Sequence, residues 1–250
     1  MDARNSFSIA SDFYARDRPH YPAELFAWIA ESCRAHRAAW DCATGNGQAA
    51  VALAQYFDLV EATDISEEQI GRGFEAPNVV YSAQAAERTN FGNERFDLIA
   101  VAQALHWFDH DRFWPEVRRL ARPGAFFCAW GYSWFEGDAE LHRSFVDPML
   151  ELLEPVWAPE NRLLWRGYRS EEIGFPFERV EPPRLSIRVQ WDIARIVRFI
   201  RTWSAHKRAL ADPETAASIM RLESDALERF AGRGAMTLDM PLAVAAGPIS

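Results

Sequence analysis

The chain has little cysteine, no excess of positive charge and no long apolar run. Its three cysteines, scattered over 250 residues, are too few for a disulfide framework or a cysteine-based metal site. No apolar run approaches the roughly 20 residues of a membrane span, and the first residues lack the apolar core of a secretory signal. A net charge of −9 disfavours general binding to nucleic acid or to an anionic membrane. We therefore expect a cytoplasmic globular protein that binds neither.

Short apolar segments and amphipathic segments alternate along the first half of the chain. Segments such as 22–35 and 109–120 have the spacing of amphipathic helices, and the apolar runs between them predict strands. Because the connections are short, the pattern predicts an α/β fold with a doubly wound, mostly parallel sheet of seven strands. The expected strands cover residues 38–42, 59–64, 79–82, 96–102, 125–130, 186–191 and 236–246.

A glycine turn follows the first expected strand. Residues 41–48 read Asp-Cys-Ala-Thr-Gly-Asn-Gly-Gln, and the two glycines open a G-x-G-x-x-A spacing. Glycine allows a tight turn and a close approach of the backbone to a ligand, and the helix after it presents free N–H groups. Asp64 ends the second strand, 17 residues after Gly47, where a carboxylate can accept both hydroxyls of a ribose. This layout predicts an adenosine-binding domain.

A loop of this spacing serves dinucleotides too, so an NAD(P)-dependent oxidoreductase stays open as an alternative. Three features favour S-adenosylmethionine. The carboxylate of Asp41 would repel a pyrophosphate, but it suits a cofactor that carries an ammonium and a sulfonium. About 40 residues precede the first strand, whereas simple dinucleotide domains often begin with it. The fourth strand ends in an aromatic loop, 103–108, which a nicotinamide enzyme would not need.

Five segments together resemble class I S-adenosylmethionine-dependent methyltransferases. They are most similar to a small-molecule branch that includes trans-aconitate methyltransferase, and residues 13–22 are similar to the opening segment of that branch. The resemblance covers about residues 11–133. It implies a Rossmann-like methyltransferase fold of type 11, S-adenosyl-L-methionine as cofactor and a small-molecule acceptor. The segments are 41–48, 62–66, 86–87, 103–109 and 122–124.

The resemblance also implies roles for single residues. Gly45 and Gly47 would line the methionine portion with Asp41 near its amino group, while Asp64 would hold the ribose and Ile65 the adenine. Ala86 and Glu87 would flank the adenine edge, Gln103 and Ala104 would lie under the sulfonium, and Ala43, Asn46 and Trp107 would complete the contacts; Tyr14, Arg18 and Tyr21 would close over the methionine carboxylate.

Two positions depart from the pattern of that family. Ala43 stands where the family usually has its first glycine, so we expect a tightened or slightly shifted loop. Ala85 stands where many relatives have an aspartate that binds the adenine amino group, and this contact is in doubt here.

The chain is expected to be one domain over 1–250 with an aromatic insertion after the fifth strand. The insertion holds several tryptophans among charges and prolines; it is either a lid over the reactive end of the cofactor or an ordinary packed insertion. The expected parts are cofactor-covering helices at 1–35, the cofactor-binding core at 36–133, the lid at 134–180, and strands and helices that complete the sheet at 181–250.

His106 is the candidate catalytic residue. It can act as a base for a hydroxyl, as a hydrogen-bond donor or cation for a carboxylate, or as a structural histidine. A carboxylate acceptor is already ionised, so its O-methylation needs positioning rather than a base. His106 and His110 stand four residues apart beside two aspartates, yet the methyl donor requires no metal and we expect none. A catalytically silent cofactor-binding protein is a further alternative.

Overall fold

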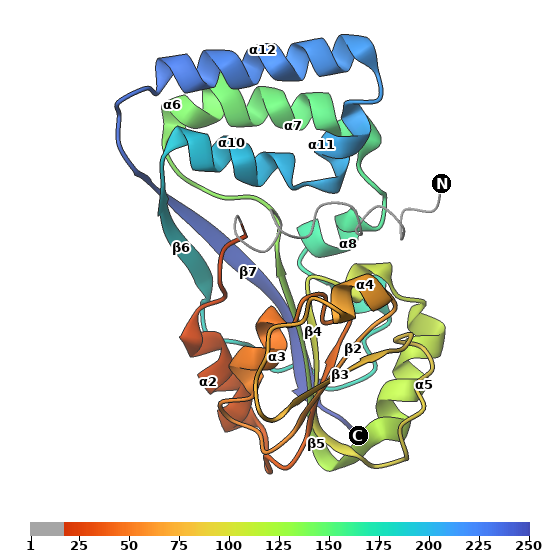
Figure 1. The fold of residues 1–250 in the computed structure, drawn as a ribbon. Helices are drawn as coiled ribbons and strands as arrows, with labels where there is room; N and C mark the ends of the chain where they lie inside the picture. The colour runs from red at the N-terminus through yellow and green to blue at the C-terminus, as the bar shows by residue number, and fades with distance from the viewer. Residues whose placement is uncertain (1–17) are drawn as a thin grey trace. The chain divides into compact units, whose positions relative to one another are not determined.

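The computed structural model describes residues 18–250, and its strands agree with the expected ones to within two residues except at β5, which is longer at its start (Figure 1). The strands are β1 (Ala39–Cys42), β2 (Val60–Asp64), β3 (Val79–Ala83), β4 (Phe96–Ala102), β5 (Ala121–Tyr132), β6 (Ser186–Trp191) and β7 (Met236–Pro248). The α-helices are α2 (Ala23–Ser32), α3 (Gln48–Leu53), α4 (Glu67–Ile70), α5 (His110–Leu120), α6 (Ala139–Leu141), α7 (Asp147–Leu153), α8 (Asn161–Trp165), α9 (Ser170–Ile173), α10 (Ile193–Arg201), α11 (Ser204–Ala209) and α12 (Pro213–Arg229). Two short 3-10 helices, η2 (Leu105–Trp107) and η4 (Glu154–Val156), and one π-helix, η3 (His142–Val146), complete them.

Within residues 18–250 the seven strands form one sheet in the order β3-β2-β1-β4-β5-β7-β6. The neighbours from β3 to β5 run parallel, and β7 pairs antiparallel to β5. The expected seven-stranded, mostly parallel sheet is confirmed. The chain moves outward from β1 to β3 and then returns to the other side of β1 with β4. This reversal is the point in a doubly wound sheet where ligands bind, beyond the carboxyl ends of the strands.

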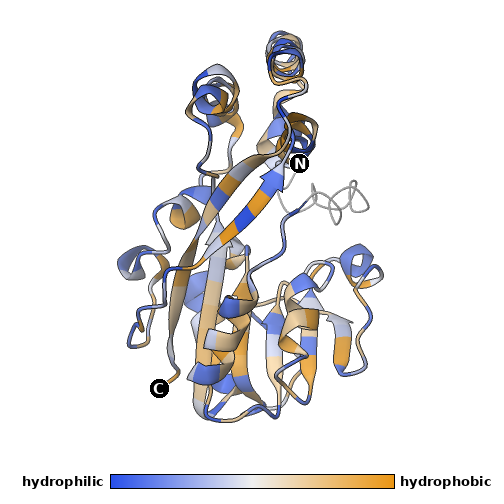
Figure 2. Ribbon diagram, turned by 90° about the vertical axis from the view of Figure 1, so that its left-hand side faces the viewer, coloured by the Kyte–Doolittle hydropathy of each residue, from blue (hydrophilic) through white to orange (hydrophobic). Residues whose placement is uncertain are grey.

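The inner parallel strands β1, β2 and β4 are buried on both faces, as parallel strands covered by helices usually are. On β4, Leu98 and Ala100 pack with α2 and α3, whereas Ile99 and Val101 face the opposite way and pack with α5. Figure 1 shows these helices on the two sides of the sheet. In Figure 2 the strands are mostly orange or pale, while the helices alternate orange with blue. Helices α2, α3 and α5 therefore each bury one stripe against the sheet.

The chain forms two compact units whose bounds differ from the expected core and lid. The sheet unit comprises 20–133, 160–186 and 241–250, and its segment 160–186 contains α8 and α9. The indole N–H of Trp114 donates to the carbonyl of Ile173 over 2.9 Å, and Phe175 packs edge-on against the same indole. These contacts explain why 160–180, expected in the lid, joins the sheet unit.

The helical unit comprises 134–159 and 187–240 together with residues 18 and 19. Its helices α6, α7, α10, α11 and α12 are short or amphipathic, so they need one another to bury their apolar faces. Trp134, Trp157 and Trp203 form an aromatic cluster with ring centroids 5.5–6.0 Å apart. The expected lid at 134–180 therefore differs from this unit, which draws most of its helices from 187–240.

None of the helices in residues 18–250 has both the length and the apolar character that crossing a bilayer requires.

Candidate functional site

The turn after β1 has left-handed backbone at three positions, Ala43 with a φ of 56°, Gly45 with 58° and Gly47 with 83°. Glycine adopts this conformation freely, whereas the Cβ of Ala43 makes it unfavourable. A Cβ at Gly47 would lie 1.9 Å from the hydroxyl of Tyr81, but one at Gly45 would meet nothing within 4 Å. The turn is thus closed beside Gly47 and open beside Gly45. The expected tightening at Ala43 takes the form of backbone strain.

Asp41 lies fully buried at the end of β1, behind the glycine turn. Its Oδ2 accepts a 2.5 Å hydrogen bond from the hydroxyl of Thr44, while its Oδ1 has no hydrogen-bond partner among residues 18–250. Burial raises the pKa of Asp41 to about 7; the Thr44 bond and the backbone N–H of Ala50 oppose this shift, and the nearby charge of Asp64 adds to it. A positive charge beside the turn would favour the ionised form of this carboxyl.

Asp64 ends β2 and binds the turn directly. Its Oδ2 accepts from the backbone N–H of Gly45 and its Oδ1 from that of Ser66, both over 2.9 Å. Burial raises the pKa of Asp64, and these two hydrogen bonds counteract the rise. Each carboxylate oxygen keeps a lone pair for a further donor, such as a ribose hydroxyl. Ser66 caps α4 by accepting from the N–H of Gln69, as the sequence predicts.

Ile65, next to Asp64, is an exposed apolar residue at this edge. Its side chain is 66% exposed, the highest value among the large exposed apolar residues of the described chain. An apolar side chain beside a ribose-binding carboxylate provides a surface on which an adenine ring can lie. The predicted pair of ribose and adenine contacts is therefore adjacent to the glycine turn.

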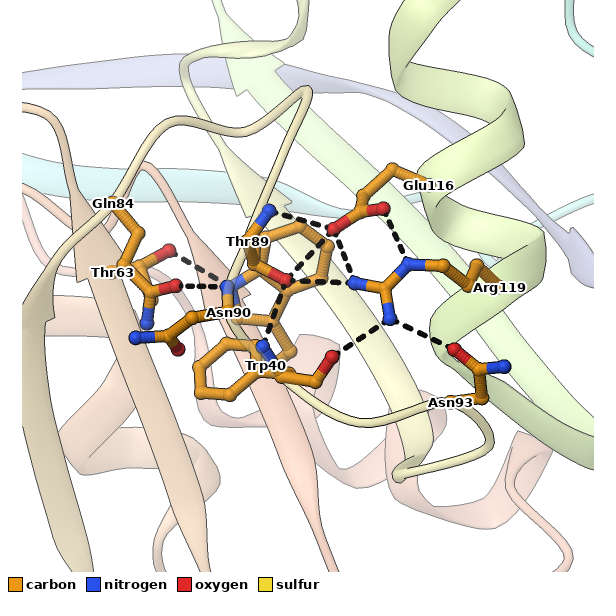
Figure 3. A network of polar contacts seen from close by, with 9 residues as sticks. Trp40, Thr63, Gln84, Thr89, Asn90, Asn93, Glu116 and Arg119 are labelled. Carbon is orange, nitrogen blue, oxygen red and sulfur yellow. Dashed lines mark hydrogen bonds and ion pairs between the residues drawn. The ribbon is translucent and has the colours of Figure 1, made fainter.

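The loop after β3 is held by a partly buried polar network, drawn in Figure 3. The Oε1 of Glu116 on α5 accepts from both the N–H and the hydroxyl of Thr89, over 2.7 and 2.8 Å. The guanidinium of Arg119 pairs with Glu116 and also donates to the carbonyl of Phe91 and to the side-chain oxygen of Asn93. These hydrogen bonds lower the pKa of Glu116 despite its partial burial. The network fixes the loop that carries the predicted adenine edge.

Ala86 and Glu87, the predicted adenine-edge residues, lie in this loop. Ala86 is buried, and the Oε1 of Glu87 accepts from the backbone N–H of Asp109 over 3.1 Å. Asp109 stands at the N-cap position of α5, but its side chain makes no cap hydrogen bond. Glu87 thus ties the β3 loop to the start of α5. Ala85 forms a bridge with Arg88 and offers only a methyl group, consistent with the doubt about the adenine amino contact.

Gln103 follows β4 with a φ of 57°, another left-handed position without glycine. Its side-chain amide donates to the carbonyl of Tyr132 over 2.9 Å and accepts from the N–H of Tyr132 over 2.7 Å. A Cβ at Gly131 would lie 2.3 Å from the Gln103 Oε1, so glycine is needed opposite this amide. The Gln103 amide joins the ends of β4 and β5, and Ala104 beside it is buried. The predicted contacts of Gln103 and Ala104 with the sulfonium stay predictions.

His106 lies in η2, just after Ala104, and is only 4% exposed. Its Nδ1 is 2.8 Å from the hydroxyl of Tyr168, and the two rings stack at an interplanar angle of 25°. Burial, with a smaller effect from His110, lowers the pKa of His106 to about 3. This lowered pKa favours a neutral imidazole near pH 7, and the predicted catalytic role of His106 stays a prediction. Trp107 packs against His106 with ring centroids 4.9 Å apart.

The predicted covering residues differ in what the structure describes. Tyr14 lies outside residues 18–250. Tyr21 belongs to the sheet unit and packs edge-on against Trp130, with ring centroids 5.7 Å apart. Arg18 belongs to the helical unit, where burial and the charge of Arg18 lower the pKa of Lys207. The predicted contacts of Arg18 and Tyr21 with the methionine carboxylate stay predictions.

Sequence reasoning missed Tyr168 as a partner of His106. Tyr168 was one aromatic residue among several in the expected lid, and it lies 62 residues from His106 in the chain. The preceding Gly167 marks a turn, but no motif connects that turn to the β4 loop. In the part of the chain that the structure describes, no three His, Cys, Asp or Glu side chains are grouped so as to hold a metal ion.

The methyltransferase-domain family matches residues 40–129, the segment that carries the glycine turn, Asp64 and the β4 loop. A protein of Dictyostelium discoideum, provisionally named a methyltransferase, is 31% identical over 208 residues, which cover 81% of this chain and 78% of that protein. The sequence likeness thus extends beyond the glycine turn into both units.

Solved structures show the same fold. A structure from Anaeromyxobacter dehalogenans, provisionally named a type II methyltransferase, is 37% identical with a TM-score of 0.80, covering 93% of this chain and 98% of that one. A second, from Bacillus halodurans and also provisionally named a methyltransferase, is 18% identical with a TM-score of 0.53, covering 90% and 97%. At that identity the second likeness shows the fold alone.

Proposed function

We propose that this chain, which belongs to the class I S-adenosylmethionine-dependent methyltransferases, transfers the methyl group of S-adenosylmethionine to a small molecule by O-methylation of a carboxylate. The observation that carries the proposal is the edge formed by Asp64 and Ile65. There a carboxylate that already binds Gly45 stands beside a 66% exposed apolar side chain. A nucleoside offers the matching pair of groups, two ribose hydroxyls and an apolar base.

The residues of this edge fit S-adenosylmethionine better than NAD(P). The open space beside Gly45 admits the methionine portion. The carboxylate of Asp41 lies behind the turn, where its negative charge favours binding of an ammonium and a sulfonium and disfavours binding of a pyrophosphate. Asp64 would bind the ribose and Ile65 would contact the adenine. The cofactor would supply an electrophilic methyl group on its sulfur.

The chain's own contribution to the transfer is alignment in a water-poor place. Gln103 and Ala104 present backbone and methyl surface at the end of β4, and the rings of His106 and Trp107 lie next to them. Displacement at a methyl carbon needs an in-line approach of acceptor, carbon and leaving sulfur, so holding the acceptor still provides much of the acceleration. A buried, mostly apolar setting also removes water that would compete as a nucleophile.

A carboxylate is the acceptor that this chemistry serves best. His106 has a pKa near 3, so it is too weak a base to deprotonate a hydroxyl or an ammonium near neutral pH. A carboxylate is ionised already and needs only a hydrogen-bond donor to orient it. The reaction forms a carbon–oxygen bond, breaks the carbon–sulfur bond and leaves the electron pair on sulfur, with no proton to move.

Calorimetry with S-adenosylhomocysteine and with NAD separates the two cofactors. We expect the homocysteine compound to bind, and we expect Asp64→Asn to weaken it about 100-fold because two charge-assisted hydrogen bonds weaken. Asp58→Asn, the same change at an exposed position, should leave the affinity unchanged. Binding of NAD with no response to the homocysteine compound would overturn the cofactor.

Turnover of labelled S-adenosylmethionine over matched acids, alcohols and amines then tests the acceptor. We expect label in the acids. Exclusive labelling of amines or alcohols would overturn the carboxylate, and labelling of none would support a catalytically silent cofactor-binding protein. Membership of the trans-aconitate methyltransferase branch stays a prediction that the same panel addresses.

A further inference from the structure

The hydroxyl of Tyr168 is buried inside the sheet unit, away from solvent. The side chain is fully buried, and its only hydrogen-bond partner among residues 18–250 is the Nδ1 of His106 at 2.8 Å. Burial raises the pKa of Tyr168 above its usual value, so the phenol keeps its proton. His106 is neutral for the same reason and carries one ring proton. The contact therefore contains a protonated phenol and a neutral imidazole.

These two groups can share the contact in two ways. Either the phenol donates to Nδ1 and the imidazole proton is on Nε2, or Nδ1–H donates to the phenol oxygen. In the second arrangement the phenol proton is buried with no acceptor, which is unfavourable by about 1–3 kcal/mol. The first arrangement satisfies both atoms. Its Nε2 has no hydrogen-bond partner in residues 18–250 and is not among the buried unpaired atoms there, so this edge of the ring keeps access to solvent.

We propose that Tyr168 is a positioning residue that holds the proton of His106 on Nε2, so that His106 meets the methyl acceptor as a hydrogen-bond donor and never as a base. The donor role of His106 rests on the proposed methyl transfer, whereas the effect of Tyr168 on the tautomer of His106 does not. The Nε2–H would bind one oxygen of the acceptor carboxylate while the other oxygen attacks the methyl carbon. An ammonium or a hydroxyl that must lose its proton gains nothing from such a donor.

The backbone around Tyr168 is built to keep this arrangement. Tyr168 has a φ of 52°, a left-handed conformation that is unfavourable by about 1–2 kcal/mol for a residue with a Cβ. The guanidinium of Arg179 holds it there: Nη1 donates to the carbonyl of Tyr168 over 2.7 Å, and Nη2 donates to the carbonyl of Val244 in β7 over 2.6 Å. Strained backbone that neighbouring residues hold in place is typical of functional sites.

The direct test is the tautomer of His106, observed in long-range proton–nitrogen spectra of the ¹⁵N-labelled full-length protein at pH 7. His106→Gln assigns the signals by their loss. We expect a protonated Nε2 and an unprotonated Nδ1 in the natural chain, and a mixture of both tautomers in Tyr168→Phe, which removes one oxygen and preserves packing. Tyr56→Phe, the same change at an exposed tyrosine, should alter nothing. A protonated Nδ1 in the natural chain, or an unchanged tautomer in Tyr168→Phe, would overturn the proposal.

Kinetics with the carboxylic acid that turns over best test the role of the donor. Tyr168→Phe should lower kcat/KM about tenfold while its affinity for S-adenosylhomocysteine stays within twofold of the natural chain. An unchanged kcat/KM alongside an altered tautomer would overturn the donor role. If the natural chain does not bind S-adenosylhomocysteine, the proposed function is overturned instead. The spectra would still decide whether Tyr168 sets the tautomer of His106.

Discussion

Two buried carboxylates, Asp41 in the sheet unit and Glu223 in the helical unit, have opposite surroundings. In the sheet unit, Asp41 has one oxygen without a hydrogen-bond partner, and burial raises its pKa to about 7. In the helical unit, Glu223 on α12 accepts from Arg201 over 2.6–3.1 Å and from His206 over 3.0 Å, and these contacts lower its pKa. The same functional group thus has an unsatisfied oxygen at Asp41 and is paired at Glu223.

We propose that the difference separates a carboxylate that binds a ligand from one that stabilises the fold. A buried charge is unfavourable unless it is paired, so an unpaired one persists only where the surrounding structure compels it. The backbone agrees with the charges. Ala43 and Gln103, two of the left-handed residues that carry a Cβ, follow β1 and β4 at the same edge as Asp41. Strain and unpaired charge together mark that edge as the functional one.

Among substitutions that test the difference between Asp41 and Glu223, we expect Asp41→Asn to have the largest effect, a change in the pH dependence of the free energy of unfolding. The folded pKa of Asp41 is raised, so its stabilising contribution is complete below the unfolded pKa and is lost as the pH rises through about 7. The amide has no such dependence. As the pH rises from 4 to 8, we therefore expect the free energy of unfolding of the variant to increase by about 2–4 kcal/mol relative to that of the natural chain. Urea unfolding across that pH range measures this difference. A constant difference would show that Asp41 is not the strained group.

The same variant should bind S-adenosylhomocysteine about tenfold more weakly, because the field that favours the ammonium is removed. Asp58→Asn is the matched control, since it removes the same charge from an exposed position. A variant that gains stability and loses affinity together would identify Asp41 as the unsatisfied partner of the ligand. Unchanged affinity would contradict that role.

The reverse experiment on the helical unit is Glu223→Gln, for which we expect a smaller effect. Glu223 has a lowered pKa, so its stabilisation is present at neutral pH and is lost as the pH falls through that lowered value. The amide should lower the free energy of unfolding by about 2 kcal/mol at pH 7, a figure discounted because Arg201 is half exposed. Affinity for S-adenosylhomocysteine should not change. Urea unfolding measures the stability and calorimetry measures the affinity, both on the same samples. An unchanged stability would contradict the claim that the pairing of Glu223 stabilises the fold.

Most of the sheet unit's edge was predictable because its signals are local. The spacing of Asp41, Gly45 and Asp64 along two strands and one turn predicts their meeting at one edge, and Gly45 does bind Asp64. Apolar runs of strand length gave the strand bounds for the same reason. The tautomer partner of His106 depends instead on packing between segments 62 residues apart. Tyr168 has no local signal that distinguishes it from an ordinary core aromatic.

The bounds of the helical unit were unpredictable for a related reason. The segment 134–180 was read as one insertion because its composition is uniform in tryptophan and charge. Whether a short helix belongs to one core or another depends on which apolar surface is available to it. Trp114 takes the α9 region into the sheet unit, while Glu223 and Arg201 hold α12 to α10. Sequence spacing shows that a helix has an apolar face, but not what covers it.

The smallest expected effect is that of Ala43→Gly, which tests the strain at the turn alone. Ala43 has a φ of 56°, which glycine adopts without the Cβ penalty; the gain is partly offset by the greater freedom of glycine in the unfolded chain. We expect the free energy of unfolding to rise by about 0.5–1 kcal/mol. Ala52→Gly in helix α3 is the matched control and should lower it by about 1 kcal/mol, because the same change acts there on an ordinary helical residue. Changes of opposite sign in the free energy of unfolding would show that the backbone conformation at the turn, rather than glycine itself, causes the gain in stability. Equal losses of stability would show that Ala43 is not strained.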